Sequence, residues 1–528
     1  MRDRTPLPWD PADHLRYAYD YYRLLAHGEL AGFAREFFSS RHFYAPFVHL
    51  VTAAVFLIFG ASKLSGILVN IVSLASLLLA VTWISRHLFA RAAGPQPTTD
   101  EAATAQPSIA LSVLPALLAS CYHFSAWLQH DAFLDFPLIA IVTISFALLI
   151  RAGEFRERRA ALAFAVSAGI GMLVKQTFAF FFVLPALYVV IRVLRTRDSR
   201  AIRNLVLATV VLVSIAAIWY GPHLHDMITI YRENSQAAAS ENEAPLFSFD
   251  SNIFYLHALV SMQMQLPLAI LFGAGLIYSF IRCRNQSVVL YLWLLSGIVA
   301  FAMVANKDVR YTVPVLPAAA LLSTCWLREF KSPANYLGAT IRNSAFVVKI
   351  ALVFVIASWA FVSFFNAQWP KPGSGTFIDS PRYRWMVFAR NYYGFDHRPL
   401  DDDWSVPEIV RTLSDRQTGS PPVLGVVVNL PFLNPSTVAM CARLMTKERA
   451  GPPLVTVKWV IAPWMIDRIE DCDYVLVRNG LDKVEFVTPI ERDVERLIRD
   501  NSTQFVQVAS FPTPLKDAEA VIYRNTNR

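Results

Sequence analysis

The chain has 528 residues, of which 55% are hydrophobic and 17% are charged, against about 25% charged residues in a typical soluble domain. Its mean hydropathy is positive, which excludes a single soluble core and favours a membrane protein with many spans. The net charge is +8, but the charged residues lie mostly in short loops between apolar runs. This distribution does not predict a nucleic-acid partner.

The first 44 residues are polar and aromatic, with neither a span nor a signal peptide. The run Pro46–Gly60 is apolar over 15 residues and could be a span, a re-entrant segment or an interfacial element. A spanning helix needs about 20 mostly apolar residues. About ten candidates of this kind follow: Ile67–Ile84, Ile109–Leu128, Phe136–Ile150, Ala160–Val174, Phe178–Leu194, Leu205–Tyr220, Ala258–Ile281, Val288–Ala305, Tyr311–Leu327 and Ala345–Phe365.

The orientation of these spans follows from the lysine and arginine content of alternate loops, because cytoplasmic loops carry more of both. One set of loops holds sixteen lysine and arginine residues; it consists of 85–107, 151–159, 192–203, 282–287 and 328–342. The other set holds four lysine and arginine residues; it consists of 121–135, the turn at Lys175, 221–257 and 306–310. We therefore expect the second set, and everything after Phe365, to lie outside the cytoplasm.

Residues 370–528 change character and predict a small soluble α/β domain. Strand-like runs alternate with helical patterns. The strands are expected at Val423–Val428, Leu454–Val460, Tyr474–Val477, Phe505–Ala509 and Ala520–Tyr523, and the helices at Ser405–Leu413, Asn434–Lys447 and Arg492–Arg499. The five cysteines lack C-x-x-C spacing and predict neither a metal knuckle nor a redox motif. Cys441 and Cys472 could pair in an extracytoplasmic domain, although two free thiols are the favoured interpretation.

Acidic side chains on the outer side form two candidate catalytic groups. Asp10, Asp13 and His14 lie within five residues, a pattern also typical of a solvated helix start. His130, Asp131 and Asp135 form the second group. Asp131 and Asp135 are four residues apart and would share a helix face, and Asp135 stands at the mouth of a span, where a buried carboxylate needs a partner.

Cations at two outer turns form a third group. Lys175 lies between two spans, and Lys307, Arg310 and Tyr311 lie in the other turn. These side chains could simply anchor the protein at the interface, or they could bind a phosphate at the depth of the lipid headgroups.

Together the three groups suggest a reaction on a lipid-linked phosphate. The cations would stabilise the phosphate as it leaves, while a carboxylate would take the proton from an incoming hydroxyl or amine, as in an inverting glycosidase. A divalent metal held by aspartates is possible, but no ligand spacing demands one, and no metal ligands are assigned.

Several short motifs, in this order and spacing, resemble the polytopic lipid-dependent glycosyltransferases of family 39, which include protein mannosyltransferases and bacterial aminoarabinose transferases. The matching pieces are Trp9-Asp10 with His14 and Tyr17, Tyr44-Ala45-Pro46 leading to Phe59-Gly60, Arg86-His87-Leu88-Phe89, Leu134-Asp135-Phe136-Pro137-Leu138, Gly171 with Lys175, and Lys307 through Arg310-Tyr311 with Pro314 and Pro317.

The resemblance implies a C-type glycosyltransferase fold in the bacterial cytoplasmic membrane and a polyprenyl-phosphate sugar donor. It implies sugar transfer on the extracytoplasmic face to a lipid, glycan or protein acceptor. In the family pattern Asp10 matches the catalytic base, with Asp13 as the alternative because Pro11 interrupts an Asp-Glu pair. Asp135 matches the second acidic position, and the cations near Lys175 and Arg310 would meet the lipid phosphate.

The family also has a transmembrane helix before its first acidic loop, so we expect a preceding helix to be missing here. We divide the chain into a first outer loop over residues 1–63, a helical membrane domain over 64–366 and an extracytoplasmic α/β domain over 367–528. Two other function classes stay open: a transporter or flippase of lipid-linked sugars, and a non-catalytic membrane scaffold. Replacement of Asp10 or Asp135 by Asn is expected to abolish transfer with folding intact.

Overall fold

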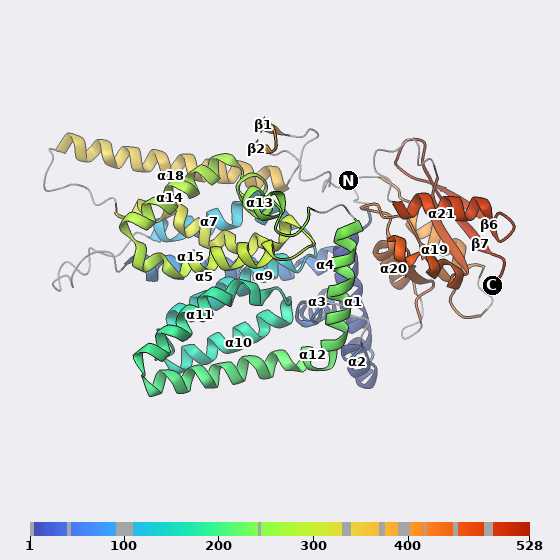
Figure 1. Cartoon of the computed structure of the whole chain (residues 1–528), viewed down its shortest axis with the longest axis horizontal. Helices are drawn as coiled ribbons and strands as arrows, with labels where there is room; N and C mark the ends of the chain where they lie inside the picture. The colour runs from blue at the N-terminus through green and yellow to red at the C-terminus, as the bar shows by residue number, and fades with distance from the viewer. Residues whose placement is uncertain are drawn as a thin grey trace.

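A computed structural model shows a helical membrane domain with a smaller sheet domain at one end (Figure 1). The structure describes residues 5–39, 44–90, 109–240, 244–329, 339–368, 375–388, 402–416, 419–446, 452–479 and 489–528. Parts of two loops predicted to be cytoplasmic, 91–107 and 330–338, lie outside the described residues, as does Lys447 at the end of one predicted helix.

Most long helices of the membrane domain run roughly alongside one another (Figure 1). In chain order they are α5 (Val69–Ala90), α7 (Ile109–Cys121), α8 (His123–Leu128), α9 (Asp135–Arg151), α10 (Arg158–Val174), α11 (Phe178–Thr196), α12 (Ser199–Ser240), α14 (Leu266–Arg282), α15 (Arg284–Ala302), α16 (Leu316–Thr324), α17 (Trp326–Glu329) and α18 (Ala339–Gln368). Each of the ten predicted segments thus falls on helical structure. Within the described residues, four helices are long and apolar enough to cross a membrane, or five if a bent pair counts as one span.

The bent pair corrects one predicted span. Residues 258–281 do not form one straight helix, because α13 (Phe249–His257) and the π-helical turn η1 (Ala258–Gln263) meet α14 at 117°. Gln265, at the break, has a φ of 69°, in the left-handed region that helices avoid. The segment predicted from Tyr311 likewise begins in a 3₁₀ turn, η2 (Val309–Val315), before α16.

The apolar run at residues 46–60 forms a 13-residue helix, α3 (Phe47–Phe59). At 1.5 Å per residue it is about 20 Å long, well short of the roughly 30 Å hydrocarbon core of a bilayer. α3 packs against α1 (Trp9–Ala26), which is followed by the short amphipathic α2 (Leu30–Phe37). By itself α3 is therefore shorter than the bilayer core, a length that also suits the re-entrant and interfacial alternatives.

The predicted outer loop at 221–257 is partly helical instead. α12 continues through it to Ser240 with Pro222 in its interior, and a proline inside a helix produces a kink because it removes a backbone hydrogen bond. Figure 1 shows α12 turning from the direction of its neighbours to run across them. The second half of α12 therefore crosses the end of the helical domain that faces the sheet domain.

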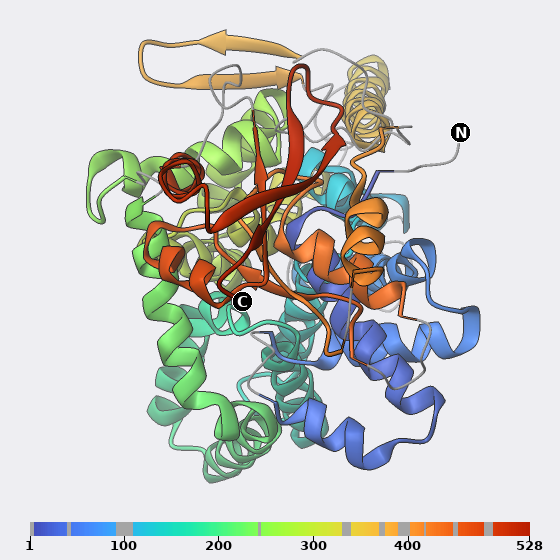
Figure 2. The ribbon, with the colours of Figure 1, turned by 90° about the vertical axis from the view of Figure 1, so that its right-hand side faces the viewer.

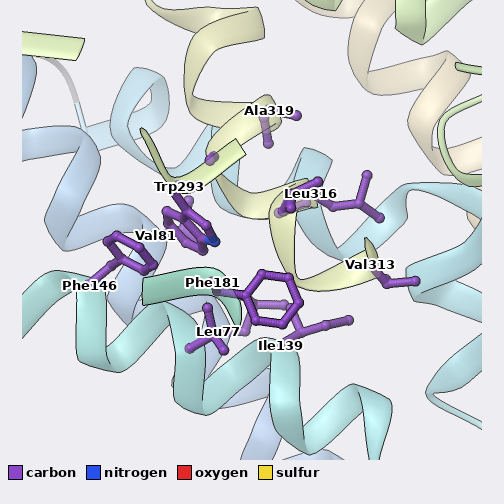
Figure 3. Packing of buried hydrophobic residues seen from close by; sticks show 14 of the residues in the cluster. Leu77, Val81, Ile139, Phe146, Phe181, Trp293, Val313, Leu316 and Ala319 are labelled. Atoms are coloured by element: carbon purple, nitrogen blue, oxygen red, sulfur yellow. The ribbon is translucent and has the colours of Figure 1, made fainter. Parts of the chain in front are cut away.

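A close-packed apolar core joins the membrane helices. Leu77 and Val81 of α5, Ile139 of α9, Phe181 of α11 and Leu316 of α16 converge in this region (Figure 3). The rings of Phe146 and Trp293 stack with centroids 4.0 Å apart. Large apolar side chains on the outer surface of the domain are exposed, as expected for helices that face lipid rather than water.

The C-terminal domain confirms the predicted α/β pattern. A five-stranded sheet has the order β4-β3-β5-β7-β6, parallel across β4, β3 and β5 and antiparallel across β5, β7 and β6. The elements are β3 (Val423–Val426), β4 (Thr456–Trp459), β5 (Tyr474–Arg478), β6 (Phe505–Pro512), β7 (Glu519–Asn525), α19 (Val406–Ser414), α20 (Pro435–Leu444), the 3₁₀ helix η3 (Pro463–Asp471) and α21 (Pro489–Asp500).

A separate hairpin of β1 (Thr376–Asp379) and β2 (Arg384–Phe388) was not predicted. Figure 2, turned so that the C-terminal domain faces the viewer, shows the five-stranded sheet lying in front of the helix ends. The sheet domain therefore covers the end of the membrane domain where α1 lies.

Candidate active site

The first turn of α1 places the acidic motif between the two domains. α1 packs against α3 on one side and against α20 of the C-terminal domain on another, which explains why so much of a short polar helix is buried. Its spacing puts Asp10, Asp13, His14 and Tyr17 on adjoining parts of one helix surface. α1 is thus a buried connector between the domains rather than a solvated helix start.

Asp10 forms an ion pair with a cation that is 300 positions away in the sequence. Its Oδ2 accepts a hydrogen bond of 2.9 Å from Nη1 of Arg310. Asp308 holds the same guanidinium from the other side, with Nε–Oδ2 and Nη2–Oδ2 distances of 2.8 and 2.5 Å, and its other oxygen caps the Arg310 amide. Arg310 is therefore fixed in one orientation between two carboxylates.

The second predicted acid and the second predicted cation also meet. Nζ of Lys175 donates a hydrogen bond of 2.7 Å to Oδ1 of Asp135, and the two side chains are only 9% and 3% exposed. Asp135 is in the first turn of α9, where the helix dipole favours a carboxylate. Lys175 caps α10 in extended backbone and lies 5.5 Å from the centroid of the Tyr311 ring.

Two adjoining cavities meet at Asp10 and Arg310. The first, of about 630 Å³, we call the polar cavity; it is lined by Asp10, Asp13, Tyr17, Tyr44, Lys175, Gln176, Thr177, Phe180, Met227, Ile230, Tyr231, Ser235, Phe301, Val304, Asn306, Lys307, Asp308, Arg310, Tyr311 and Trp459. The second, of about 610 Å³, we call the aromatic cavity; it is lined by Trp9, Asp10, Trp127, Phe133, Phe254, Lys307, Asp308, Val309, Arg310, Asn429, Trp459 and Ile461. Both cavities share Asp10, Lys307, Asp308, Arg310 and Trp459.

Lys307 contributes to both cavities and also closes a helix end. Its Nζ donates to the carbonyl oxygens of Ala302 (2.8 Å) and Phe301 (3.3 Å) at the end of α15, and it lies 5.4 Å from the centroid of the Tyr255 ring. The ammonium is thus held by carbonyl oxygens, whereas Arg310 and Lys175 are held by carboxylates.

Asp13, the alternative base, faces the C-terminal domain. Its Oδ1 accepts from Nη2 of Arg16 at 2.8 Å and its Oδ2 from the Ser436 hydroxyl at 2.7 Å. Further along the same interface, Asp20 of α1 pairs with Arg443 of α20. Asp13 therefore joins the domains, which makes Asp10 the better placed of the two acids for chemistry.

His14 is not among the described residues that line the two cavities. Its Nδ1 is 3.1 Å from Nε2 of His49 on α3, and its ring meets that of Tyr44 edge-on at 4.6 Å. Burial lowers the pKa of His14 well below its ordinary value, and the charges of Lys175 and Arg310 lower it further. The imidazole is therefore neutral at physiological pH, and it packs against Tyr44.

Tyr44 also lines the polar cavity. Burial, and next the nearby Asp10 carboxylate, raise the pKa of the Tyr44 phenol well above its ordinary value. The hydroxyl consequently stays protonated and can donate a hydrogen bond to an anion.

The other two predicted supporting residues are placed elsewhere. Among the described residues that line the two cavities, neither His130 nor Asp131 is present. The Asp131 carbonyl instead accepts a hydrogen bond of 2.9 Å from the Asn70 amide of α5. His130 and Asp131 therefore lie outside the two cavity walls, although Trp127 and Phe133 on either side of them line the aromatic cavity.

Among the cavity residues to which the sequence prediction gave no role are Asp308, Asn429 and Trp459. Asp308 lies in the same turn as Lys307, Arg310 and Tyr311, but the sequence prediction gave it no role. Asn429 and Trp459 belong to the C-terminal domain, and no local motif marks either of them. Within the described ranges, no group of three His, Cys, Asp or Glu side chains could hold a metal ion, and the divalent-metal hypothesis stays a prediction.

No family model matches the chain, and no curated protein matches it in sequence. Among solved structures it is similar to ArnT from Cupriavidus metallidurans, bound to undecaprenyl phosphate (14% identity) and in the apo state (17% identity), with a TM-score of 0.57 in each case. The likeness covers 99% of this chain and 95% of ArnT. The chain has the C-type glycosyltransferase fold.

A weaker likeness, with a TM-score of 0.45 and 14% identity, links 92% of this chain to 36% of the arabinofuranosyltransferase AftD from mycobacteria. The ArnT comparison confirms the fold that the sequence resemblance implies. With its apolar helices, the chain is an integral membrane protein.

Proposed function

We propose that the protein is a glycosyltransferase that moves a sugar from a polyprenyl-phosphate donor to an acceptor, with Asp10 as the general base and with inversion at the anomeric carbon. The observation that carries this proposal is the position of Asp10 and Arg310 in the wall shared by two cavities. A base and a phosphate-binding cation are thereby adjacent in the wall between two separate cavities, one of which could hold the donor and the other the acceptor.

The polar cavity suits the donor. It holds Lys175, Lys307 and Arg310, together with the protonated hydroxyl of Tyr44, and the second half of α12 forms another part of its wall. Cationic and hydroxyl donors of this kind bind phosphate oxygens. The solved ArnT complex contains undecaprenyl phosphate, which supports a polyprenyl-phosphate lipid as the donor of this chain.

In the proposed step, Asp10 takes the proton of the acceptor hydroxyl or amine while that atom attacks the anomeric carbon of the donor sugar. The bond between this carbon and the phosphate oxygen breaks, and the electron pair leaves with the phosphate. Arg310 and Lys175 stabilise the charge that develops there. Attack on the face opposite the leaving phosphate inverts the configuration.

The proposed setting is the bacterial cytoplasmic membrane, with the cavities and the C-terminal domain on the outer face. The lysine and arginine bias of the loops supports this orientation. The acceptor would be a lipid, a glycan or a protein that reaches this face.

The test is release of polyprenyl phosphate by the purified protein in lipid nanodiscs, with a panel of polyprenyl-phosphate sugars as donors. Asp10→Asn should reduce the rate by about a hundredfold to ten-thousandfold, the usual contribution of a general base. The matched control is Asp250→Asn, since Asp250 is an exposed outer carboxylate paired with Arg382; it should leave the rate unchanged.

Failure to consume any donor, or full activity of Asp10→Asn, would overturn the proposal. A parallel reaction with a chelator tests the divalent-metal hypothesis, because a metal-dependent enzyme would lose activity that added metal restores.

A further inference from the structure

The aromatic cavity has a composition that points to a ligand class. Its wall carries the rings of Trp9, Trp127, Phe133, Phe254 and Trp459. Trp127 and Phe133 lie with ring centroids 5.4 Å apart, and the guanidinium of Arg310 lies 4.6 Å from the Phe133 ring centroid. Broad apolar ring faces with a few polar groups among them fit a ligand that has an apolar face and a hydrogen-bonding edge.

The charged groups of this cavity balance one another. Two carboxylates, of Asp10 and Asp308, face two cations, of Lys307 and Arg310, and Arg310 is paired with both carboxylates. This wall therefore has no net formal charge, and its five aromatic rings outnumber its four charged groups. A neutral ligand with hydroxyl groups fits such a wall without breaking an ion pair, whereas the donor phosphate would approach Arg310 from the polar cavity, where Lys175 also lies.

The C-terminal domain supplies part of this wall from a defined edge of its sheet. Trp459 is the last residue of β4, and Asn429 follows β3, the parallel strand beside it. Ligands of open parallel sheets bind outside the carboxyl ends of the strands, which is where both residues lie. Oδ1 of Asn429 accepts a hydrogen bond of 2.7 Å from Nε1 of Trp9, so this edge is fixed to α1 next to Asp10.

We propose that the aromatic cavity is the acceptor subsite and that it takes a neutral saccharide residue, with Trp459 of the C-terminal domain as a stacking platform. The inference rests on the proposed glycosyl transfer. The ring of Trp459 would cover the C–H face of the sugar, while Asn429 and Asp308 would bind its hydroxyl groups. Trp459 lines both cavities and therefore stands next to the atoms between which the sugar moves.

The chain contains a matched control for Trp459. Trp464, in η3 of the same domain, is 39% exposed, against 38% for Trp459, and it is not among the described residues that line either cavity. The variants Trp459→Ala and Trp464→Ala remove the same side chain from similarly exposed positions. A general effect of tryptophan loss on the domain would appear in both.

The experiment is saturation-transfer NMR on the full chain in nanodiscs, with the methyl glycosides of common neutral sugars as probes. Glucosamine 1-phosphate and an acetylated serine-containing peptide amide serve as the anionic and polypeptide comparisons. At least one neutral glycoside should bind to the wild-type protein, and Trp459→Ala should weaken that binding by about tenfold. Trp464→Ala should bind like the wild type.

Three results would overturn the inference: no binding of any neutral glycoside, stronger binding of the phosphorylated sugar or the peptide, or equal losses in both tryptophan variants. Donor consumption is measured separately on the same wild-type sample. Donor consumption without glycoside binding would contradict the saccharide subsite but not the proposed glycosyl transfer. If a glycoside binds in a way that depends on Trp459 but no donor is consumed, the proposed glycosyl transfer is contradicted and the saccharide site is supported.

Discussion

Replacement of Asp135 by asparagine should destabilise the protein, because Asp135 and Lys175 form a buried pair. The N–O distance is 2.7 Å and both side chains are nearly fully buried. Removing one partner of such a pair leaves an uncompensated charge in a medium of low polarity, which costs about 3–5 kcal/mol. Asparagine keeps the shape of the side chain, so the loss is electrostatic rather than steric.

The same change at Asp10 should behave differently. Asp10 is 34% exposed, and its partner Arg310 keeps Asp308 when Asp10 is neutralised. Partly exposed pairs contribute about 0–1 kcal/mol, so Asp10→Asn should fold almost like the wild type and lose catalysis instead. The structure therefore separates two carboxylates for which the sequence predicts one shared outcome.

A double-mutant cycle checks the reasoning. Asp135→Asn, Lys175→Met and the combined variant are compared by thermal unfolding in nanodiscs, with Asp10→Asn alongside. The combined variant should recover most of the stability lost in Asp135→Asn, since the unpaired ammonium is gone, but transfer should stay low because Lys175 no longer meets the phosphate. Wild-type stability of Asp135→Asn, or additive losses in the double variant, would refute the buried-pair argument.

Three further changes follow from the site. Arg310→Lys should lower donor turnover at least about tenfold, because one ammonium cannot span both carboxylates and a phosphate as a guanidinium does; equal rates would refute this. Asp13→Asn should keep transfer and increase proteolytic cleavage between the domains, since Ser436 and Arg16 lose their charged acceptor. The pKa of His14 is depressed in the folded protein. The free energy of unfolding should therefore fall as pH drops below about 6.5, by at most about 1.4 kcal/mol per pH unit. In the His14→Asn variant the thermal-unfolding temperature should depend less on pH over this range.

Much of the architecture could be predicted from local patterns. Long apolar segments located the membrane helices, and alternating apolar runs located the five strands of the C-terminal sheet. The same approach failed where the chain departs from regular geometry. The break at Gln265 lies between Gln263 and Pro267, a short polar interruption in a longer apolar segment. An average of hydropathy over about 20 residues does not resolve so short an interruption.

The extension of α12 was missed for a related reason. Hydropathy falls after Tyr220, which predicts that the span ends, but a fall in hydropathy marks the edge of the membrane rather than the end of a helix. Pro222 redirects α12 without ending it. The helix then leaves the direction of its neighbours and forms a wall of the polar cavity.

The composition of the site was predictable only in part, because ion pairing is decided by the tertiary fold. Residue types and their side of the membrane suggested that Asp10, Asp135, Lys175 and Arg310 belong together. Which acid meets which cation depends on how α1, α9 and η2 pack. Trp459 could not be predicted at all, because its place depends on the docking of the C-terminal domain onto α1.

The pairing of the cations bears on how the proposed reaction would gain rate. A phosphodiester donor carries one negative charge, whereas the leaving polyprenyl phosphate, a monoester, carries about 1.5 to 2 at neutral pH. Arg310 is paired with two carboxylates and Lys175 with one. Both cations are therefore already partly neutralised when the intact donor binds. As the bond to the sugar breaks and Asp10 gains a proton, Asp10 ceases to compete for Arg310. The guanidinium then interacts more strongly with the departing phosphate than with the intact donor, and an interaction that strengthens along the reaction lowers the barrier instead of merely tightening binding.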